Sequence, residues 1–514
     1  MVYLNDGEVR EKTDRINTVR ETLRLSMSEV SKTYSKLFLV DTLEKVGISR
    51  HFSREITRIL DMAYKLWLQK DEEMIMDMET CAMAFRILRM HGYDVSSDVL
   101  AHFSEESRFP DSVVQGSLND TKAILELYKA SKVECALQLP FYSSVLEPLE
   151  HKRNIEHFST NGIQMRKSAF LPHHIAEDII ALAVAEFHSA QSLYRQELQY
   201  VDSCMQLVVG KRWVKEVRLD QLKFLRILPL DVFFFLASSV LPRELSDARI
   251  AWIQNCLLTT AVDDLFDVAG SSEELQNLIA LFEKWDAHNE IGFCSEDVET
   301  VFYAVYNTSN KIGERAAEVQ NRSVISHIAQ LWLDTARAMM KEAEWSREGH
   351  VPSMEEYMPV AEVSFALGPI VPTSLYLMGP ELLPEEVVRG PEYGGLMRLT
   401  NVCCRLLNDM ASYGRESGDG KIANSVLLLH LHSASSVDMA KEEIRRTVEA
   451  SKRELLRLVI TAAGGGGVPR PCKDLFWNMC KVANLTYLQA NGYCSLEEML
   501  GAASAVEVHE PLNV

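Results

Sequence analysis

The sequence predicts an all-α fold, on two observations. Apolar residues recur at helical spacing along nearly all of the 514 residues. Alternation of apolar and polar residues over a few positions, which is typical of half-buried strands, is nearly absent. With 47% hydrophobic residues, a chain of this length has enough apolar side chains to build roughly two to four domains with sizeable cores.

The helical pattern falls into two blocks. The first runs from about Arg10 to Cys135, and a weakly patterned stretch that contains Pro, Ser and Gly follows it. We therefore place a domain boundary at Gly162, which gives domains 1–162 and 163–514. The second block begins with a helix predicted over residues 176–199 and continues to the C-terminus.

Composition and charge exclude several classes of function. A net charge of −20 argues against a nucleic-acid partner, because such proteins normally present a basic face. The ten cysteines lack Cys-x-x-Cys or zinc spacing and are typical of buried thiols in a reducing compartment. No apolar run approaches the roughly 20 residues of a membrane span. The first residues have neither the apolar core of a secretory signal nor the composition of a transit peptide, so no organelle address is expected there.

Three aspartates lie at the end of an apolar helical pattern over 252–266. Asp263 and Asp267 are four residues apart, so both carboxylates project from about the same helix face, with Asp264 at its edge. Acids on an apolar stripe are costly unless a cation compensates them. Mg²⁺ suits this place, since it binds a few carboxylates and keeps positions for water or diphosphate oxygens. A solvated helix end is the alternative interpretation.

A second group of oxygen ligands lies in residues 405–416. Asn408, Ser412 and Glu416 are spaced i, i+4 and i+8, and each step of four residues turns the direction by only about 40°, so they form one stripe. Arg405, one turn earlier, is positioned to bind a diphosphate oxygen bidentately. A polar helix face with a capping Asn is the alternative. Together, however, the two groups in separate helices predict a magnesium site.

These residues resemble the two metal-binding motifs of the plant class I terpene synthases. The DDxxD motif is matched by Asp263, Asp264 and Asp267, and the (N/D)DxxSxxxE motif by Asn408, Asp409, Ser412 and Glu416. Longer blocks resemble ent-kaurene synthases and kaurene synthase-like diterpene cyclases, among them VDTLEKVGISRHF, DMETCAMAFRILR, RELSDARIAW and RPCKDLFW.

The resemblance implies a class I terpenoid synthase helical bundle, the catalytic α domain, from about Ile163, preceded by a helical β domain. Segment 32–45 runs straight into β-domain sequence where full-length kaurene synthases insert a γ domain, so a γ-less chain is expected. The β domain is expected to be shortened, because YKASK joins VECALQLPFY directly. No DxDD motif of class II cyclases occurs, so an upstream copalyl diphosphate synthase is expected to supply the substrate. The resemblance implies a plastid location, and the cytoplasm is the alternative because no transit peptide is seen in the sequence.

The resemblance also implies how a prenyl diphosphate is ionised. A Mg²⁺ cluster binds the diphosphate, and Arg226 and Arg405 complete its binding and stabilise the charge that develops on the leaving group. Arg226 stands about where the family keeps a diphosphate-binding arginine, with a surface helix arginine as the alternative. The expected substrate is ent-copalyl diphosphate, and the expected product is ent-kaurene or a related tetracyclic diterpene.

A helix break is predicted within FALGPIVPTS, residues 365–374. Gly368 and Pro369 are expected to break or kink a helix there, because Pro lacks an amide donor and clashes with the preceding turn. In the family such a break lies against the substrate. Ile370 matches what ent-kaurene-type enzymes carry and favours a tetracyclic product; a structural kink with a packed Ile is the alternative.

Aromatic side chains are candidates for cation-π contact with the carbocation. The candidates are Phe233, Phe234 and Phe235, with Trp332 and Tyr376 as weaker ones, and a role in the apolar core is the alternative for each.

Other functions remain open at this point. Another copalyl stereoisomer or another prenyl diphosphate is a possible substrate, since the motifs do not select it. A chain-elongating prenyltransferase would be expected to carry two DDxxD motifs, and only one occurs. A non-catalytic helical scaffold derived from a synthase is the remaining alternative, and the intact set of metal ligands argues against it.

Overall fold

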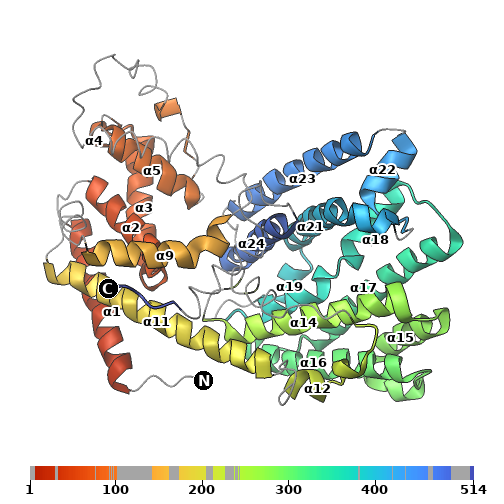
Figure 1. Ribbon diagram of the computed structural model, residues 1–514. Coiled ribbons are helices and arrows are strands. Elements are labelled where there is room, and N and C mark those ends of the chain that lie inside the picture. Colours follow the sequence, from red (N-terminus) through yellow and green to blue (C-terminus); the bar gives the residue numbers. More distant parts are fainter. Residues whose placement is uncertain are drawn as a thin grey trace. The chain divides into compact units, whose positions relative to one another are not determined.

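The computed structural model is built from helices (Figure 1). The structure describes residues 6–28, 33–75, 77–91, 93, 95–96, 98–100, 142–160, 173–203, 212–225, 237, 241, 244–379, 383–418, 421–433, 436–460, 467–487 and 510–514. Over this part of the chain the elements are helices joined by turns, without a strand, and the prediction of an all-α fold is confirmed.

The chain forms two compact units. The first comprises Met1–Leu139, Leu146–Tyr194 and Gly501–Val514, and the second comprises Pro140–Val145 and Arg195–Leu500. The described chain passes from the first unit to the second within one long helix, α11 (His173–Ser203). Gly162 lies outside the described residues, so the domain boundary at that position stays a prediction.

The first unit packs its helices around an apolar core. Its elements are α1 (Asp6–Ser28), α2 (Thr33–Lys45), η1 (Ser49–Phe52), α3 (Ser53–Leu68), α4 (Glu72–Ile75), α5 (Met78–Met90), most of α9 (Tyr142–Thr160) and most of α11. The buried carboxylate of Glu186 in α11 pairs with Lys12, Arg50 and His51. This one acid thus joins α11 to the N-terminal helix and to η1. The proposed shortening of the β domain falls largely on residues outside the described ranges.

The second unit carries the motifs of interest. Its elements are α12 (Arg212–Glu216), η3 (Leu219–Gln221), α14 (Ser246–Asp264), the π-helical turn η4 (Leu265–Ala269), α15 (Ser272–Lys284), η5 (Trp285–Glu290), α16 (Glu296–Gln320), α17 (Ile325–Glu348), α18 (Met354–Ser364), α19 (Leu367–Tyr376), α20 (Glu385–Val388), α21 (Pro391–Gly418), α22 (Ser425–Ser433), α23 (Val437–Ile460) and α24 (Arg470–Tyr487). Helix α14 packs against α16 and α19, while α21 packs against α23 and α24.

Side-chain caps explain where several of these helices begin. Ser271 and Ser353 each accept a hydrogen bond from the backbone three residues on, and the Glu at that position bonds back to the cap. These capping boxes satisfy amide donors that would otherwise lack partners in the first turn.

A break separates α18 from α19, and the two helices meet at a bend of 43°. The break lies at Ala366, which adopts a left-handed conformation with φ of 66°. The prediction placed the break at Gly368 and Pro369, and both instead lie in the first turn of α19. Proline is tolerated there because amides of the first turn have no partner within the helix.

In the described part of the chain, no single helix is long and apolar enough to cross a membrane. Only the bent pair formed by α18 and α19 meets both requirements when the two are counted together.

Candidate active site

A cavity of about 780 Å³ opens in the second unit. Its walls come from α14 and η4, α17, the junction of α18 and α19, α21, the segment after α21, and α24. Pockets of this size hold substrates as large as a drug molecule. Both predicted groups of oxygen ligands reach this cavity.

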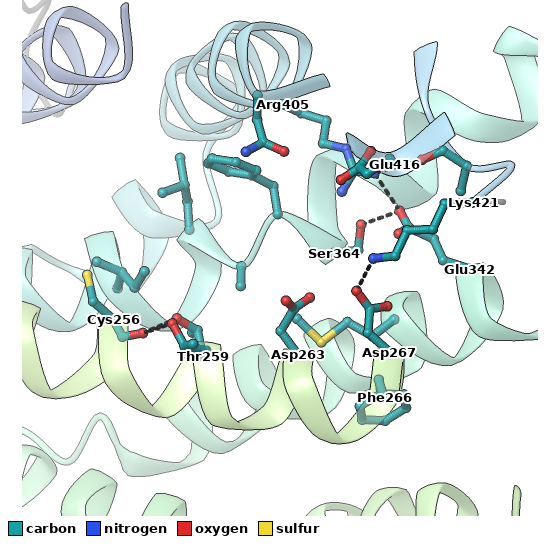
Figure 2. Close-up of a pocket in the computed structure, with 18 of the residues that line it drawn as sticks. Cys256, Thr259, Asp263, Phe266, Asp267, Glu342, Ser364, Arg405, Glu416 and Lys421 are labelled. Atoms are coloured by element: carbon teal, nitrogen blue, oxygen red, sulfur yellow. Dashed lines mark hydrogen bonds and ion pairs between the residues drawn. The ribbon is translucent and has the colours of Figure 1, made fainter. Parts of the chain in front are cut away.

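The first wall is a single stripe along α14. Trp252, Cys256, Thr259 and Asp263 line the cavity at successive intervals of four, three and four residues, which is one face of a helix. Asp267 continues the stripe from η4. Figure 2 shows Asp263 and Asp267 projecting from this wall toward the side that carries Glu416 and Arg405.

The aspartate helix ends in a π-helical turn. The backbone amide of Gly270 donates to the carbonyl of Leu265 at 2.7 Å, which closes a ring one residue wider than an α-turn. A Cβ atom at position 270 would lie 2.7 Å from that carbonyl oxygen and 2.7 Å from the side chain of Leu275. Because both neighbours are buried, a residue larger than glycine fits this turn only if one of them moves, and Asp267 lies within the turn.

The facing wall is α21. Asn408, Glu416 and Arg405 line the cavity from this helix. Ser412 does not line it, and its hydroxyl donates to the carbonyl of Asn408 at 2.9 Å. The side chain of Asn424, in the short segment before α22, donates to Glu416 Oε2 at 2.9 Å and so orients that carboxylate.

Arg405 is embedded in a buried polar network. Its Nε atom lies 2.9 Å from both the hydroxyl of Tyr357 and Oδ1 of Asp409, and Nη2 lies 3.4 Å from Oε1 of Glu342. Tyr357 in turn donates to Asp409 at 2.8 Å. These partners fix the guanidinium at the cavity wall, with 12% of the side chain exposed.

Glu342 is a carboxylate in this network that the sequence analysis did not single out. Burial raises its pKa, while the nearby Arg405 guanidinium and a hydrogen bond from Ser364 act in the opposite direction. The Ser364 hydroxyl donates to Glu342 Oε1 at 2.6 Å, which ties α17 to the end of α18 (Figure 2). A single buried acid thus contacts both Arg405 and the helix next to the break.

The two walls are joined by an ion pair across the cavity. Lys421, in the segment after α21, places its Nζ on Oδ2 of Asp267 (Figure 2). No motif in the sequence marks this lysine, because it lies outside the regular spacing of both ligand groups.

The structure brings together some predicted residues and not others. Asp263, Asp267, Asn408, Glu416, Arg405 and Ile370 all line one cavity. Asp264 is fully buried beside them and, like Ser412, does not line it. Arg226 and the phenylalanines 233–235 lie outside the described residues. Trp332 and Tyr376 are buried away from the cavity lining.

Other aromatic residues line the cavity in place of these candidates. They are Trp252, Phe266, Phe365 and Tyr487. Trp252 was detectable in the sequence, because it precedes Asp263 by three helical turns on the same face. Burial raises the pKa of Tyr487 to about 12, so this phenol stays neutral beside the cavity.

The oxygen donors fit a hard divalent cation. Carboxylates of Asp263 and Asp267 face the amide and carboxylate of Asn408 and Glu416, which are the ligand types that Mg²⁺ takes. Within the described ranges, no three His, Cys, Asp or Glu side chains are close enough to hold a metal by themselves. A metal here would complete its coordination shell with other oxygens, such as those of water or a diphosphate.

Comparison with known proteins decides the family. Residues 215–454 match the model of the terpene synthase family, metal binding domain, and residues 4–137 match that of the terpene synthase N-terminal domain. Ent-kaur-16-ene synthase of Oryza sativa subsp. japonica is 47% identical, over 94% of this chain and 67% of that protein. The chain belongs to the terpene synthase family. The predicted metal-binding domain is thereby confirmed, while its individual ligands stay predictions.

Further relatives place the chain among the plant kaurene synthase-like enzymes, as predicted. Dolabradiene synthase of Zea mays is 52% identical, over 94% of this chain and 60% of that protein. Ent-beyerene synthase of Oryza sativa subsp. japonica is 49% identical, over 93% of this chain and 62% of that protein. The chain thus spans about 60% of the length of these two relatives. All three relatives are named as chloroplastic proteins.

Solved structures share the fold of this terpene synthase. Isoprene synthase of grey poplar, in complex with three Mg²⁺ ions and dimethylallyl-S-thiolodiphosphate, matches with a TM-score of 0.75 at 22% identity, over 98% of this chain and 97% of that one. Abietadiene synthase of Abies grandis matches with a TM-score of 0.74 at 26% identity, over 94% of this chain and 68% of that one. The predicted helical terpene synthase fold is confirmed.

Proposed function

We propose that this protein is a class I diterpene synthase that uses Mg²⁺ to ionise a copalyl diphosphate and cyclises the hydrocarbon, with release of diphosphate. The observation that carries the proposal is the single cavity lined by Asp263 and Asp267 on one wall and by Asn408 and Glu416 on the other. Relatives with 47–52% identity are diterpene-forming synthases by name, which supports it.

The metal ligands proposed are those of the two motifs. They are Asp263, Asp264 and Asp267, and Asn408, Ser412 and Glu416. Bound Mg²⁺ would neutralise negative charge on the departing diphosphate and so lower the barrier to ionisation. Of the six, Asp264 and Ser412 have the weakest support, because neither lines the cavity, and a supporting role for their side chains would leave the other four as direct ligands.

Arg405 is proposed to bind the diphosphate. Its guanidinium keeps its charge, because Glu342 and Asp409 oppose the effect of burial and raise its pKa. The network of Tyr357 and Asp409 orients the group in advance, which reduces the cost of ordering it when an anion arrives. Arg226 is proposed as a second diphosphate ligand on the family resemblance alone.

The remainder of the cavity is suited to a carbocation. Trp252, Phe365, Leu367 and Ile370 give it an apolar and aromatic surface that offers water few hydrogen bonds. Exclusion of water matters because water would quench the cation to an alcohol. Aromatic faces such as that of Trp252 also stabilise positive charge directly.

The finer proposal is that ent-copalyl diphosphate is converted to ent-kaurene or a related tetracyclic diterpene. Ile370 lies at the cavity beside the helix break, where its bulk bears on the folding of the substrate. The relatives differ in product, from dolabradiene to beyerene and kaurene, so motif residues alone do not select among them. We further propose a plastid location and supply of substrate by an upstream copalyl diphosphate synthase.

The test is product analysis by gas chromatography and mass spectrometry. The full chain is incubated with ent-, syn- and normal copalyl, geranylgeranyl and farnesyl diphosphates, with Mg²⁺ or with chelator. Asp263→Ala is compared with Asp247→Ala, a matched control at the other end of α14 whose exposed carboxylate pairs with Arg315. We expect a diterpene from ent-copalyl diphosphate that is lost with chelator and with Asp263→Ala but kept with Asp247→Ala.

Other outcomes would change the conclusion. A hydrocarbon from a different substrate would keep the class I mechanism and replace the substrate. Absence of product from every substrate, in protein shown to be folded by circular dichroism, would favour the non-catalytic scaffold.

A further inference from the structure

A side-chain cation lies on the cavity wall that carries the proposed metal ligands. The ammonium of Lys421 lies on the carboxylate of Asp267, and the two side chains belong to segments 154 residues apart. The pair lies at the accessible part of the cavity, since 41% of the lysine side chain and 31% of the aspartate side chain are exposed. Lys421 can therefore leave Asp267 without disturbing the core.

The backbone that carries Lys421 is held close to the second ligand group. Its amide donates to the carbonyl of Glu416 at 3.0 Å, and the nearby Asn424 side chain donates to the carbonyl of Asp409 at 3.0 Å and to Glu416 Oε2 at 2.9 Å. These bonds fix the segment at both ends. The lysine therefore reaches Asp267 from a set position, and only its flexible side chain needs to move.

The charges around the cavity favour a metal that arrives with an anion. Among the described residues that line it, the acidic side chains are Asp263, Asp267, Glu342 and Glu416, and the basic ones are Arg347, Arg405, Arg415 and Lys421. The formal charges of this set cancel. A bare divalent cation would be repelled by the ammonium already on Asp267.

We propose that Lys421 is an internal counter-ion of Asp267 that weakens metal binding by this ligand until a diphosphate is present. The inference rests on the proposed function, because it concerns the same metal site. The ammonium on Oδ2 of Asp267 offsets the negative charge that this carboxylate offers a metal, and the ammonium and a bound metal would repel each other across the carboxylate. Lys421 therefore opposes the binding of a metal alone, whereas a diphosphate that enters with the metal offers the ammonium a new anionic partner.

The test measures metal binding without substrate. Mn²⁺ serves as a spectroscopic substitute for Mg²⁺, and free Mn²⁺ is followed by electron paramagnetic resonance in titrations of the full chain. The variants are Lys421→Met, which removes the charge, and Lys421→Arg, which keeps it. Lys284→Met is the matched control, since this exposed lysine pairs with Glu290 and does not line the cavity.

We expect Lys421→Met to bind Mn²⁺ about threefold to fivefold more tightly than the wild type, because a partly exposed ion pair contributes only a small free energy. Lys421→Arg and Lys284→Met should bind like the wild type. Lys421→Gln, which is also neutral, replaces Lys421→Met should the latter fail to fold by circular dichroism. Equal or weaker binding by the neutral variant would overturn the inference.

Asp263→Ala separates this inference from the proposed function. If Asp263→Ala abolishes Mn²⁺ binding while the neutral Lys421 variant matches the wild type, the metal site stands and the counter-ion role fails. If Asp263→Ala binds Mn²⁺ as well as the wild type does, the proposed metal site itself fails, and with it the role of Lys421.

Discussion

Gly270 provides a direct test of how the aspartate helix ends. The substitution Gly270→Ala places a Cβ atom 2.7 Å from the carbonyl oxygen of Leu265 and 2.7 Å from Cδ2 of Leu275. Both distances are well inside van der Waals contact, so at least one neighbour must move. Leu265 and Leu275 are 1% and 0% exposed, which leaves neither of them free space.

The cost follows from this crowding. Overpacking a filled core by one methyl group lowers the free energy of unfolding by about 1–3 kcal/mol. The upper half of that range is expected, because one of the crowded atoms is a backbone carbonyl that also accepts the 2.7 Å hydrogen bond closing the π-turn. If the turn changes conformation, the carboxylate of Asp267 no longer points toward the cavity. Magnesium-dependent turnover should then fall by more than the loss of stability accounts for.

The measurement pairs urea unfolding with product formation at several Mg²⁺ concentrations. Gly394→Ala is the matched control, since no atom lies within 4 Å of the added Cβ there and the position is helical. This control should gain up to about 1 kcal/mol, because alanine is favoured over glycine within a helix. A Gly270→Ala variant as stable and as active as the wild type would refute the steric argument and the role given to the turn.

Two further substitutions test the network around the cavity. Because burial raises the pKa of Glu342, the folded protein binds this proton more tightly than the unfolded chain does, and stability should fall as the pH rises from 4.5 toward the raised pKa. Glu342→Gln should flatten this part of the stability profile, measured by urea unfolding between about pH 4 and 8. An unchanged slope would contradict the assignment. Asn424→Ala removes bonds to Glu416 and to the carbonyl of Asp409 together with the cap of α22, so a loss of about 1–2 kcal/mol and a higher Mg²⁺ requirement are expected. Ser436→Ala, which removes only an exposed cap of α23, should lower stability and leave the Mg²⁺ dependence unchanged, and equal Mg²⁺ dependence in both variants would count against the role of Asn424.

Much of the site could be predicted because helical spacing is regular. The interval between Asp263 and Asp267, and that between Asn408 and Glu416, place side chains on one helix face whatever the surrounding sequence. The same rule places Trp252 on the helix face that carries Asp263, so the residues along one wall of the cavity could be predicted from their spacing. Periodicity also predicted the fold class, because it requires no knowledge of which helices meet.

Local conformation was harder to predict where one backbone choice depends on tertiary contacts. Proline and glycine in FALGPIVPTS indicated a break, yet Pro369 fits the first turn of α19 and the break falls at Ala366 instead. Alanine has no preference for φ of 66°, so the surrounding packing imposes that conformation. The sequence likewise gives no indication of the π-turn at residues 265–269, because this turn differs from an α-turn only in which carbonyl accepts the hydrogen bond.

The residues that sequence reasoning missed are those that act between helices. Glu342 accepts a hydrogen bond from Ser364 at 2.6 Å at the end of α18 and pairs with Arg405 at 3.4 Å on α21. The arginine proposed to bind diphosphate and the helix that ends at the break beside Ile370 therefore share one buried carboxylate. A substitution at Glu342 should disturb both together, so diphosphate binding and the shape of the apolar cavity are not independent properties of this site.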